Sequence, residues 1–379
     1  MAAAVQAGVL TAMIRSSEID ISPEPVRGFY AQKLLRRELG FMGVLLCDWE
    51  DVDRRSDQEG LAQDQREAVK RAIMAGVDMI RGPCDFRFHE YLLDLVKSEE
   101  VPMQRIDEAV SRILRLKYEL GLFAKPYPDR SLLDRRERQK SVELNYQAAC
   151  EALTLLKNER QVLPLSSNVK VLVTGPCANK LSVLNRDGHL VEPADPEALA
   201  SQHKDSILEA IEQKLGEDRV IFFDSAFDEV GDFAALVQVA REVDVVIACL
   251  GEPSHQITAC MGGLDMSKPQ MDLVSALAKT GKPVIAVLVQ GRPRIIHQIE
   301  GRLDAIALAY RPGMEGGRAL ADILFGHVNP SGRLPFSYPR YADRQRCYDH
   351  VLREETDPNG LDPQWAFGHG LSYTAFRYR

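Results

Sequence analysis

Apolar runs and polar segments alternate along the first part of the chain, and their lengths predict strands followed by helices. The clearest strand is residues 44–47 (VLLC), an apolar run without polar alternation, which is typical of a strand buried on both faces of a parallel sheet. Further strands are expected at 9–14 and 76–80, and helices at 1–7, 26–39, 58–74, 88–97 and 106–120. The pattern predicts a series of βα units, although three strands cannot close an eight-stranded barrel.

A polar, proline-containing and densely charged segment, 124–141, follows these units and is expected to be a solvated linker. A helix is expected at 142–152, and the segment 155–165 then leads into a second alternating region. Its strands are expected at 169–174, 220–223, 243–250, 283–289 and 305–310, and its helices at 204–215, 232–242, 270–280 and 316–325. Residues 142–379 are therefore predicted to form a mainly parallel open sheet with helices on both faces.

The composition is that of a globular protein, and it narrows the range of partners. The 379 residues are 45% hydrophobic and 27% charged, and the net charge of -8 argues against nucleic acid or an anionic membrane as the main partner. No run of 18 apolar residues predicts a membrane span, and the N-terminal segment lacks the basic residues of a signal peptide. The seven cysteines are scattered, and Cys47 and Cys249 lie in apolar runs, as expected of small buried residues.

Several familiar catalytic motifs are missing from the sequence. There is no GxSxG, HExxH or Walker A motif and no GxGxxG after a strand, and the eight histidines show no metal-ligand spacing, so neither a cofactor nor a metal is expected. The glycines of PGMEGG (Gly313, Gly316 and Gly317) open a helix and could approach a phosphate, as in a nucleotide-binding α/β protein. We favour close packing of that helix on the sheet.

Carboxylates at strand ends remain as candidates for catalysis. Asp48 and Trp49 directly follow the strand at 44–47, and active sites of α/β barrels lie at the carboxyl ends of their strands. An indole can stack on a sugar ring while the carboxylate meets the anomeric carbon; the structural alternative is that Asp48 caps the next helix. A retaining glycosidase needs a second carboxylate about 5–5.5 Å away. The long loop at 251–268 offers Glu252 and Asp265, near its two ends. For Glu252, which belongs to the strand end, we favour a role in capping or orienting the loop.

These segments resemble glycoside hydrolase family 3, the β-glucosidases, β-glucan exohydrolases and β-xylosidases. The resemblance is collinear and spans nearly the whole chain. It is carried by ELGFMGVLLCDWEDV (38–52), AGVDMI (75–80), AVSRILRLKYELGLF (109–123), LLKN with VLPL (155–165), DVVIACLGE (244–252), TGKPVIAVLVQGRP (280–293), AYRPGMEGG to PFSYP (309–339) and WAFGHGLSYTAF (365–376).

The resemblance implies the C-terminal part of a (β/α)₈-type barrel (1–123), a linker (124–141) and an α/β sandwich domain with a mainly parallel sheet (142–379). By that likeness Asp48 matches the nucleophile, which forms a covalent glycosyl-enzyme, and Trp49 would help to wall the subsite for the terminal sugar. The implied substrate is a small glycoside or an oligosaccharide with a terminal β-linked glucosyl or similar residue, hydrolysed with retention.

Two departures from the family pattern qualify the resemblance. Only 47 residues precede Asp48, so most of the family's βα units are absent, and a missing N-terminal segment or a second chain is expected to complete the barrel. The family's acid/base Glu follows the Gly-Glu pair that ends the strand, at a position corresponding here to Ile257. That residue and its neighbours Thr258, Ala259 and Cys260 carry no carboxylate.

Two function classes follow from these observations. The first is a β-glucosidase-like glycoside hydrolase with Asp48 as nucleophile. The second is a catalytically impaired family member that acts as a carbohydrate- or protein-binding module, which the missing Glu and the incomplete barrel favour.

Overall fold

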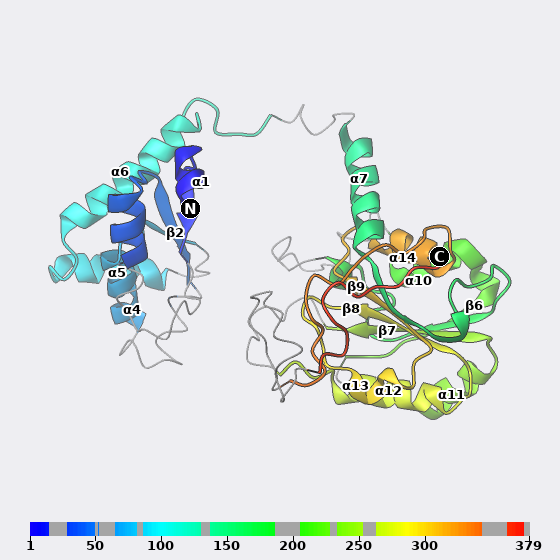
Figure 1. Cartoon of the computed structure of the whole chain (residues 1–379). Helices are drawn as coiled ribbons and strands as arrows, with labels where there is room; N and C mark the ends of the chain where they lie inside the picture. Colours follow the sequence, from blue (N-terminus) through cyan, green and yellow to red (C-terminus); the bar gives the residue numbers. More distant parts are fainter. Residues whose placement is uncertain are drawn as a thin grey trace. The chain divides into compact units, whose positions relative to one another are not determined.

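A computed structural model describes residues 1–14, 29–49, 52, 65–81, 86–129, 137–185, 205–227, 233–252, 263–342 and 362–374. The chain divides into two compact units, Met1–Leu133 and Asp134–Arg379, and the boundary falls inside the segment 124–141. Each unit has its own hydrophobic core. Figure 1 shows the helices and strands of both.

The first unit is built on a parallel three-stranded sheet in the order β1-β2-β3. Its strands are β1 (Thr11–Met13), β2 (Val44–Asp48) and β3 (Met79–Arg81). Central strand β2 is the predicted apolar run, and its Val44, Leu45 and Cys47 are fully buried. Because the strands are parallel, their carboxyl ends lie at the same edge of the sheet.

Helices cover this sheet and supply most of the core of the first unit (Figure 1). They are α1 (Ala2–Gln6), η1 (Phe29–Glu38), α4 (Gln65–Met74), α5 (Arg87–Lys97) and α6 (Met103–Glu119). Apolar side chains of α4 and α5, among them Val69, Ile73 and Leu95, pack against Cys47 and Ile80 of the strands. Because only one face of each helix is buried, the apolar residues recur at intervals of about three to four residues.

A buried carboxylate joins the strands of the first unit to its helices. Asp78 precedes β3, and its fully buried side chain forms ion pairs with Arg36 at 2.7 Å, Arg105 at 3.0 Å and Arg112 at 2.8 Å. It also accepts a hydrogen bond from the backbone N–H of Leu45, at 3.0 Å. This cluster lies at the amino-terminal end of β3, the side of a barrel that serves stability.

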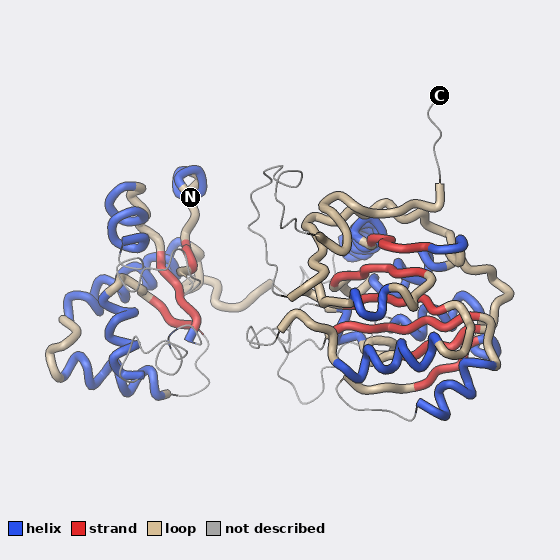
Figure 2. The backbone as a smooth tube through the Cα atoms, turned by 60° about the horizontal axis from the view of Figure 1, so that its bottom comes forward, coloured by secondary structure: helices blue, strands red, loops and turns tan. Residues whose placement is uncertain are grey.

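The second unit is built on a six-stranded sheet in the order β4-β9-β8-β7-β5-β6, in which only β4 runs antiparallel to its neighbour (Figure 2). The strands are β4 (Thr154–Asn158), β5 (Val171–Thr174), β6 (Val220–Phe223), β7 (Val245–Gly251), β8 (Val284–Val289) and β9 (Ala305–Tyr310). The described residues of β5, β7 and β8 are buried throughout, as expected for parallel strands covered on both faces.

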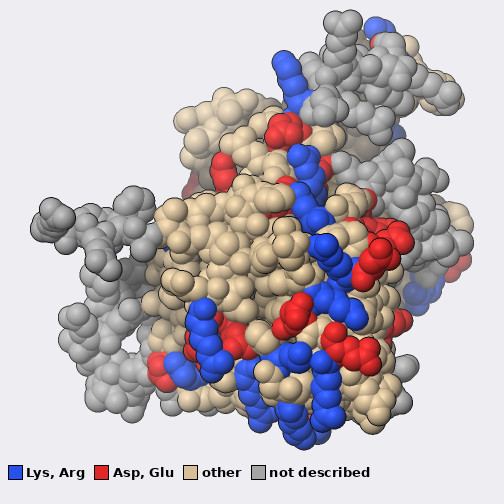
Figure 3. Space-filling view, turned by 90° about the vertical axis from the view of Figure 1, so that its right-hand side faces the viewer, with Lys and Arg blue, Asp and Glu red and all other residues tan. Residues whose placement is uncertain are grey.

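Helices cover both faces of this sheet and complete three layers (Figure 1). One face packs on α7 (Glu137–Ala152), α10 (Ile207–Leu215) and α14 (Gly316–Leu324), and the other on α11 (Phe233–Arg241), α12 (Lys268–Ala278) and α13 (His297–Glu300). The shorter elements are α8 (Leu181–Leu184), η3 (Glu159–Gln161) and η5 (Glu217–Arg219). On the face that Figure 3 presents, basic and acidic side chains are interspersed beside a broad area that carries neither.

The α/β class with mainly parallel sheets is confirmed, and every strand predicted from the sequence is present with ends shifted by a few residues. Strand β4 is an addition, because its residues fall in a segment that the sequence analysis left unassigned. A single antiparallel edge strand has one strand neighbour, here β9, and the short run TLLKN carries no clear alternation to reveal it.

Candidate active site

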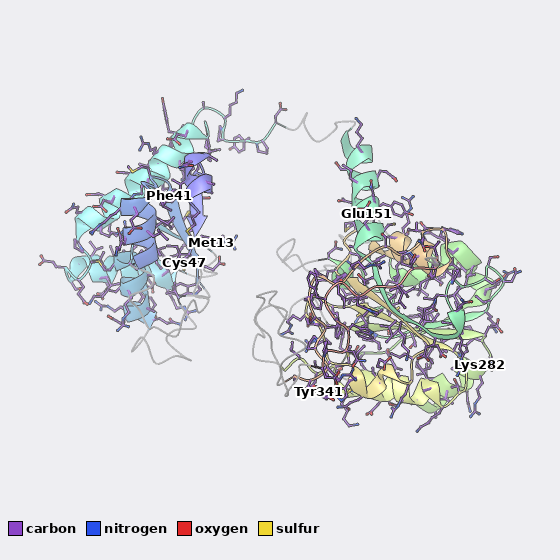
Figure 4. The ribbon with its side chains drawn as sticks, viewed as in Figure 1. Met13, Phe41, Cys47, Glu151, Lys282 and Tyr341 are labelled. Carbon is purple, nitrogen blue, oxygen red and sulfur yellow. The ribbon has the colours of Figure 1, made fainter. Side chains whose placement is uncertain are left out.

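Asp48 is the last residue of β2, at the carboxyl edge of the sheet in the first unit. Its side chain is 22% exposed, whereas Cys47 immediately before it is fully buried. Figure 4 marks Cys47 together with Met13, which lies near the corresponding end of β1. The carboxylate therefore stands where the buried strand ends and solvent begins, as the sequence analysis expects.

Among the described residues, Arg81 is the charged partner of Asp48. The two residues are paired in register on the parallel strands β2 and β3, and the Nε–H of Arg81 donates to Oδ1 of Asp48 at 2.8 Å. This hydrogen bond raises the pKa of Arg81, and the added Coulomb attraction of the carboxylate acts in the same direction. The side chain of Arg81 is 53% exposed, so the pair lies at the surface of the described sheet.

Trp49 follows Asp48 and is only 7% exposed. Its ring belongs to the core cluster of the first unit and meets Phe88 of α5 in an edge-on contact with ring centroids 6.1 Å apart. Among the described residues, the indole thus anchors the end of β2 within the core. A contact with a sugar ring stays a prediction.

The second candidate region follows β7 of the second unit. Residues 253–262, which include Ile257, Thr258, Ala259 and Cys260, lie outside the described residues, so the predicted acid/base position is not placed. Glu252 itself is described, and its side chain is 4% exposed. Asp265, at the far end of the loop, is exposed, and its backbone pairs with Ile295 in a parallel bridge.

Glu252 is enclosed by arginines at the carboxyl ends of the parallel strands. Arg292 donates to Oε2 through Nη2 at 3.0 Å, and Arg294 donates to the same oxygen through Nη2 at 2.6 Å and Nε at 3.0 Å. Oε1 accepts from the backbone N–H groups of Gly291 and Arg292, at 2.9 and 3.1 Å, and Arg311 lies 3.7 Å away.

The pKa of Glu252 results from opposing effects. Burial acts to raise the pKa of this carboxyl, but the hydrogen bonds and charges of Arg292 and Arg294 outweigh burial and lower it. Glu252 is consequently a bound carboxylate, and its chemistry is that of an anchor for the arginines and for the start of the loop. From the sequence, a role for Glu252 in capping or orienting the loop is favoured over a role as the second catalytic carboxylate, and its contacts agree with that interpretation.

Of the three glycines of PGMEGG, Gly317 serves close packing, and its neighbour is the start of a helix rather than the sheet. A Cβ on Gly317 would lie 2.5 Å from the carbonyl oxygen of Asp205 and 2.7 Å from that of Ser206. These residues lead into α10, which begins with a capping box between Ser206 and Glu209. Only glycine lets α14 approach this backbone so closely.

No group of three or more metal-ligating side chains forms within the described ranges. The described cysteines Cys47, Cys150, Cys177 and Cys249 are buried, which confirms the expectation for Cys47 and Cys249. Burial raises the pKa of the Cys177 and Cys249 thiols, so both are neutral packing residues. No helix among the described residues is long and apolar enough to cross a membrane.

Arg81 and the arginines around Glu252 were missed by the sequence analysis. For Arg81 a signal existed, because it ends a strand next to the one that ends in Asp48, and parallel neighbours bring such residues together. The contacts of Glu252 join positions about 40 residues apart, and no local pattern announces them.

Comparison with known protein families finds two domain models that match successive parts of the chain. Residues 1–116 match the Glycosyl hydrolase family 3 N terminal domain, and residues 153–373 match the Glycosyl hydrolase family 3 C-terminal domain. The second match alone covers more than half of the chain.

Similar relatives include the lysosomal beta glucosidase of Dictyostelium discoideum, 35% identical over 98% of this chain and 47% of the relative. The periplasmic beta-glucosidase of Salmonella typhimurium is 30% identical over 99% of this chain and 54% of the relative. Among solved structures, the beta-glucosidase from Listeria innocua in complex with glucose matches with a TM-score of 0.74 and 27% identity, over 99% of this chain and 53% of that one.

The chain thus spans about half the length of the relatives it matches. Both domain matches occur in the order that the two structural units follow. The resemblance seen in the sequence is confirmed, and the chain belongs to glycosyl hydrolase family 3.

Proposed function

We propose that this chain is part of a retaining glycoside hydrolase that removes terminal β-linked glucosyl or similar residues, with Asp48 as the nucleophile. The observation that carries the proposal is the position of Asp48, a partly exposed carboxylate at the carboxyl end of a buried barrel-type strand. It lies within the part of the chain that matches the family's N-terminal domain.

The chemistry assigned to Asp48 is a two-step displacement. One carboxylate oxygen bonds to the anomeric carbon as the bond to the aglycone breaks, and the aglycone oxygen takes the electron pair. Water then bonds to the same carbon, loses a proton, and releases the Asp48 carboxylate. Two inversions at one carbon leave the β configuration unchanged.

The substrate class is supported by the relatives. Their names describe beta-glucosidases and beta-xylosidases, and structures of the Listeria innocua protein contain glucose or laminaribiose. We therefore propose a β-glucoside, or a similar small glycoside or oligosaccharide, as the substrate.

The missing acid determines which aglycones suit the enzyme. No carboxylate stands at Ile257 or its neighbours, and general acid catalysis typically contributes about 10²-fold to 10⁴-fold in rate. For substrates whose leaving group needs no proton, such as dinitrophenyl glycosides, the missing acid should slow hydrolysis only a little. Azide should accelerate their turnover, since it attacks the glycosyl-enzyme without base assistance.

The test is hydrolysis of 2,4-dinitrophenyl β-glucoside, with and without azide, by the native enzyme in the form whose barrel is complete. We expect measurable release of dinitrophenolate, acceleration by azide, and a β-glucosyl azide product. Asp48→Ala should abolish the activity. The control is Asp107→Ala, which removes an exposed carboxylate of α6 and should leave the activity unchanged. Activity that survives Asp48→Ala would refute the assignment of the nucleophile.

We also propose that βα units beyond the described sheet complete the barrel, from the same polypeptide or from a second chain. Strands β1 and β3 are both edges of the sheet, and Met13 and Met79 on them are exposed. The mass of the native polypeptide separates the sources. A mass well above 42.4 kDa supports the same polypeptide, and a mass of 42.4 kDa supports a second chain. A glycosidase fully active as a 42.4 kDa monomer contradicts both.

The alternative function is a catalytically impaired family member that binds a carbohydrate or a protein. The absence of a carboxylate at the acid/base position favours it. Calorimetry with gluco-oligosaccharides distinguishes it from the enzyme. Binding without turnover, unaffected by Asp48→Asn, would support a carbohydrate-binding module, and no binding at all would remove that version.

A further inference from the structure

We propose that Arg81 positions the nucleophile: it holds Oδ1 of Asp48, leaves Oδ2 to attack the sugar, and stabilises the carboxylate when the glycosyl ester breaks. The inference rests on the proposed function of Asp48 and extends it to a residue on the neighbouring strand. Its basis is the in-register pair at the carboxyl ends of β2 and β3.

The geometry distinguishes the two carboxylate oxygens. Nε of Arg81 donates to Oδ1 at 2.8 Å, and within the described residues Oδ2 accepts no hydrogen bond. A carboxylate with one oxygen held by a cation on an adjacent strand keeps a fixed orientation. Its second oxygen is then the one free to reach an anomeric carbon.

The location of the pair favours a role in the site over a role in stability. An exposed ion pair contributes little to folding, because solvent screens it. Arg81 is more than half exposed and Asp48 partly exposed, whereas the carboxylate of the first unit that has a structural role, Asp78, is fully buried at the opposite end of β3. The Arg81–Asp48 pair lies where the loops of a barrel form its active site.

The second step of the reaction is where Arg81 acts most strongly. As water or azide bonds to the anomeric carbon, the bond from that carbon to Oδ2 breaks and its electron pair returns to Asp48. The negative charge that develops on the leaving carboxylate is shared with Oδ1, which receives the charged hydrogen bond from Arg81. Arg81 is positively charged throughout the working range, because its pKa is raised further by the carboxylate.

The experiment uses 2,4-dinitrophenyl 2-deoxy-2-fluoro-β-glucoside, which forms a long-lived glycosyl ester with a carboxylate nucleophile. The burst of dinitrophenolate gives the rate of labelling, and regain of activity in azide gives the rate of ester cleavage. In Arg81→Met we expect ester cleavage to slow by about 10-fold or more, the effect of losing one charge-assisted hydrogen bond to the leaving group. The concentration for half-maximal labelling should not change.

Arg81→Lys should recover part of the cleavage rate, because the charge is kept while the fixed Nε geometry is lost. The matched control is Arg115→Gln, which removes an exposed arginine paired with Glu119 on α6. This variant should label and recover like the parent. Circular dichroism and the emission of Trp49 verify that each variant is folded.

The outcomes separate the inference from the function on which it rests. A parent enzyme with a complete barrel that is not labelled at Asp48 refutes the proposed nucleophile, and the role of Arg81 with it. Labelling at Asp48 combined with a parental rate of ester cleavage in folded Arg81→Met and Arg81→Lys leaves the nucleophile in place and overturns the role of Arg81. Slow cleavage in Arg81→Met, partly restored in Arg81→Lys, supports it.

Discussion

Replacing Glu252 by Gln should destabilise the second unit strongly, although the two side chains have nearly the same shape. Glu252 is a nearly fully buried carboxylate that neutralises Arg292 and Arg294 and accepts two backbone hydrogen bonds. An amide keeps one acceptor oxygen but turns an N–H₂ group toward donors. It also leaves the buried Arg294 and the partly exposed Arg292 without their counter-charge.

The expected loss of stability follows from the fact that Glu252 and its arginines form a buried ion-pair cluster. Breaking a buried ion pair by removing one partner costs about 3–5 kcal/mol, because the remaining charge stays desolvated. For a unit of this size each kcal/mol lowers Tm by about 2–4 °C, so we expect a fall in Tm on the order of 10 °C.

The pH dependence has a definite sign. The folded-state pKa of Glu252 is lowered, so its contribution to stability is complete above the pKa of the unfolded carboxyl and is lost as pH falls through the folded value. The difference in stability between the parent and Glu252→Gln should therefore be constant near neutral pH and shrink on acidification below about pH 4.5.

The assay can report on each unit separately, because the chain has two tryptophans, one in each unit. In a Trp49→Phe background, the emission of Trp365 follows the second unit. Trp365 contacts Tyr338, whose hydroxyl donates to the backbone oxygen of Arg294. The control is Glu159→Gln, a 60% exposed carboxylate paired with Lys157, which should change stability by no more than about 0.5 kcal/mol.

A loss below about 1 kcal/mol in Glu252→Gln would refute this reasoning. So would a difference from the parent that grows as the pH is lowered. Either result would mean that the arginines are stabilised independently of Glu252.

Two further predictions concern the stability of the two units, one for each. Asp78→Asn leaves three arginines around a neutral side chain and should cost the first unit about 3–5 kcal/mol, followed by denaturation with Trp49 emission; a loss under about 1 kcal/mol would contradict the role of the cluster. Gly317→Ala places a methyl group within 2.5 Å of a carbonyl oxygen and should cost the second unit about 1–3 kcal/mol in thermal unfolding, whereas unchanged stability would show that α14 and α10 can separate freely.

Much of the fold could be predicted because parallel strands buried on both faces give continuous apolar runs in the sequence. The runs that became β2, β7 and β8 are apolar on both faces, so they stand out from their polar flanks without any knowledge of the fold. The position of Asp48 followed from the same run, because the first charged residue after it marks the strand end. Edge strand β4 was not predicted, because TLLKN is short and has only β9 as a strand neighbour.

The surroundings of the candidate residues could not be predicted. Arg81 lies 33 residues from Asp48, and Arg294 lies 42 residues from Glu252. Such pairs depend on strand order and register, which hydrophobic periodicity does not specify. The same limit explains the contact of Gly317, since its small size predicts a close approach but does not name the neighbour.

The central claim is that Asp48 forms the covalent bond to the sugar, and peptide mapping after trapping tests it most directly. The native enzyme, with its barrel complete, is incubated with the 2-deoxy-2-fluoro-β-glucoside, digested, and analysed by tandem mass spectrometry. We predict a fluoroglucosyl group on the peptide that contains Asp48, attached to that residue, and no label in Asp48→Ala. A label on another carboxylate, or an unlabelled chain that still releases dinitrophenolate from the unsubstituted glucoside, would contradict the account.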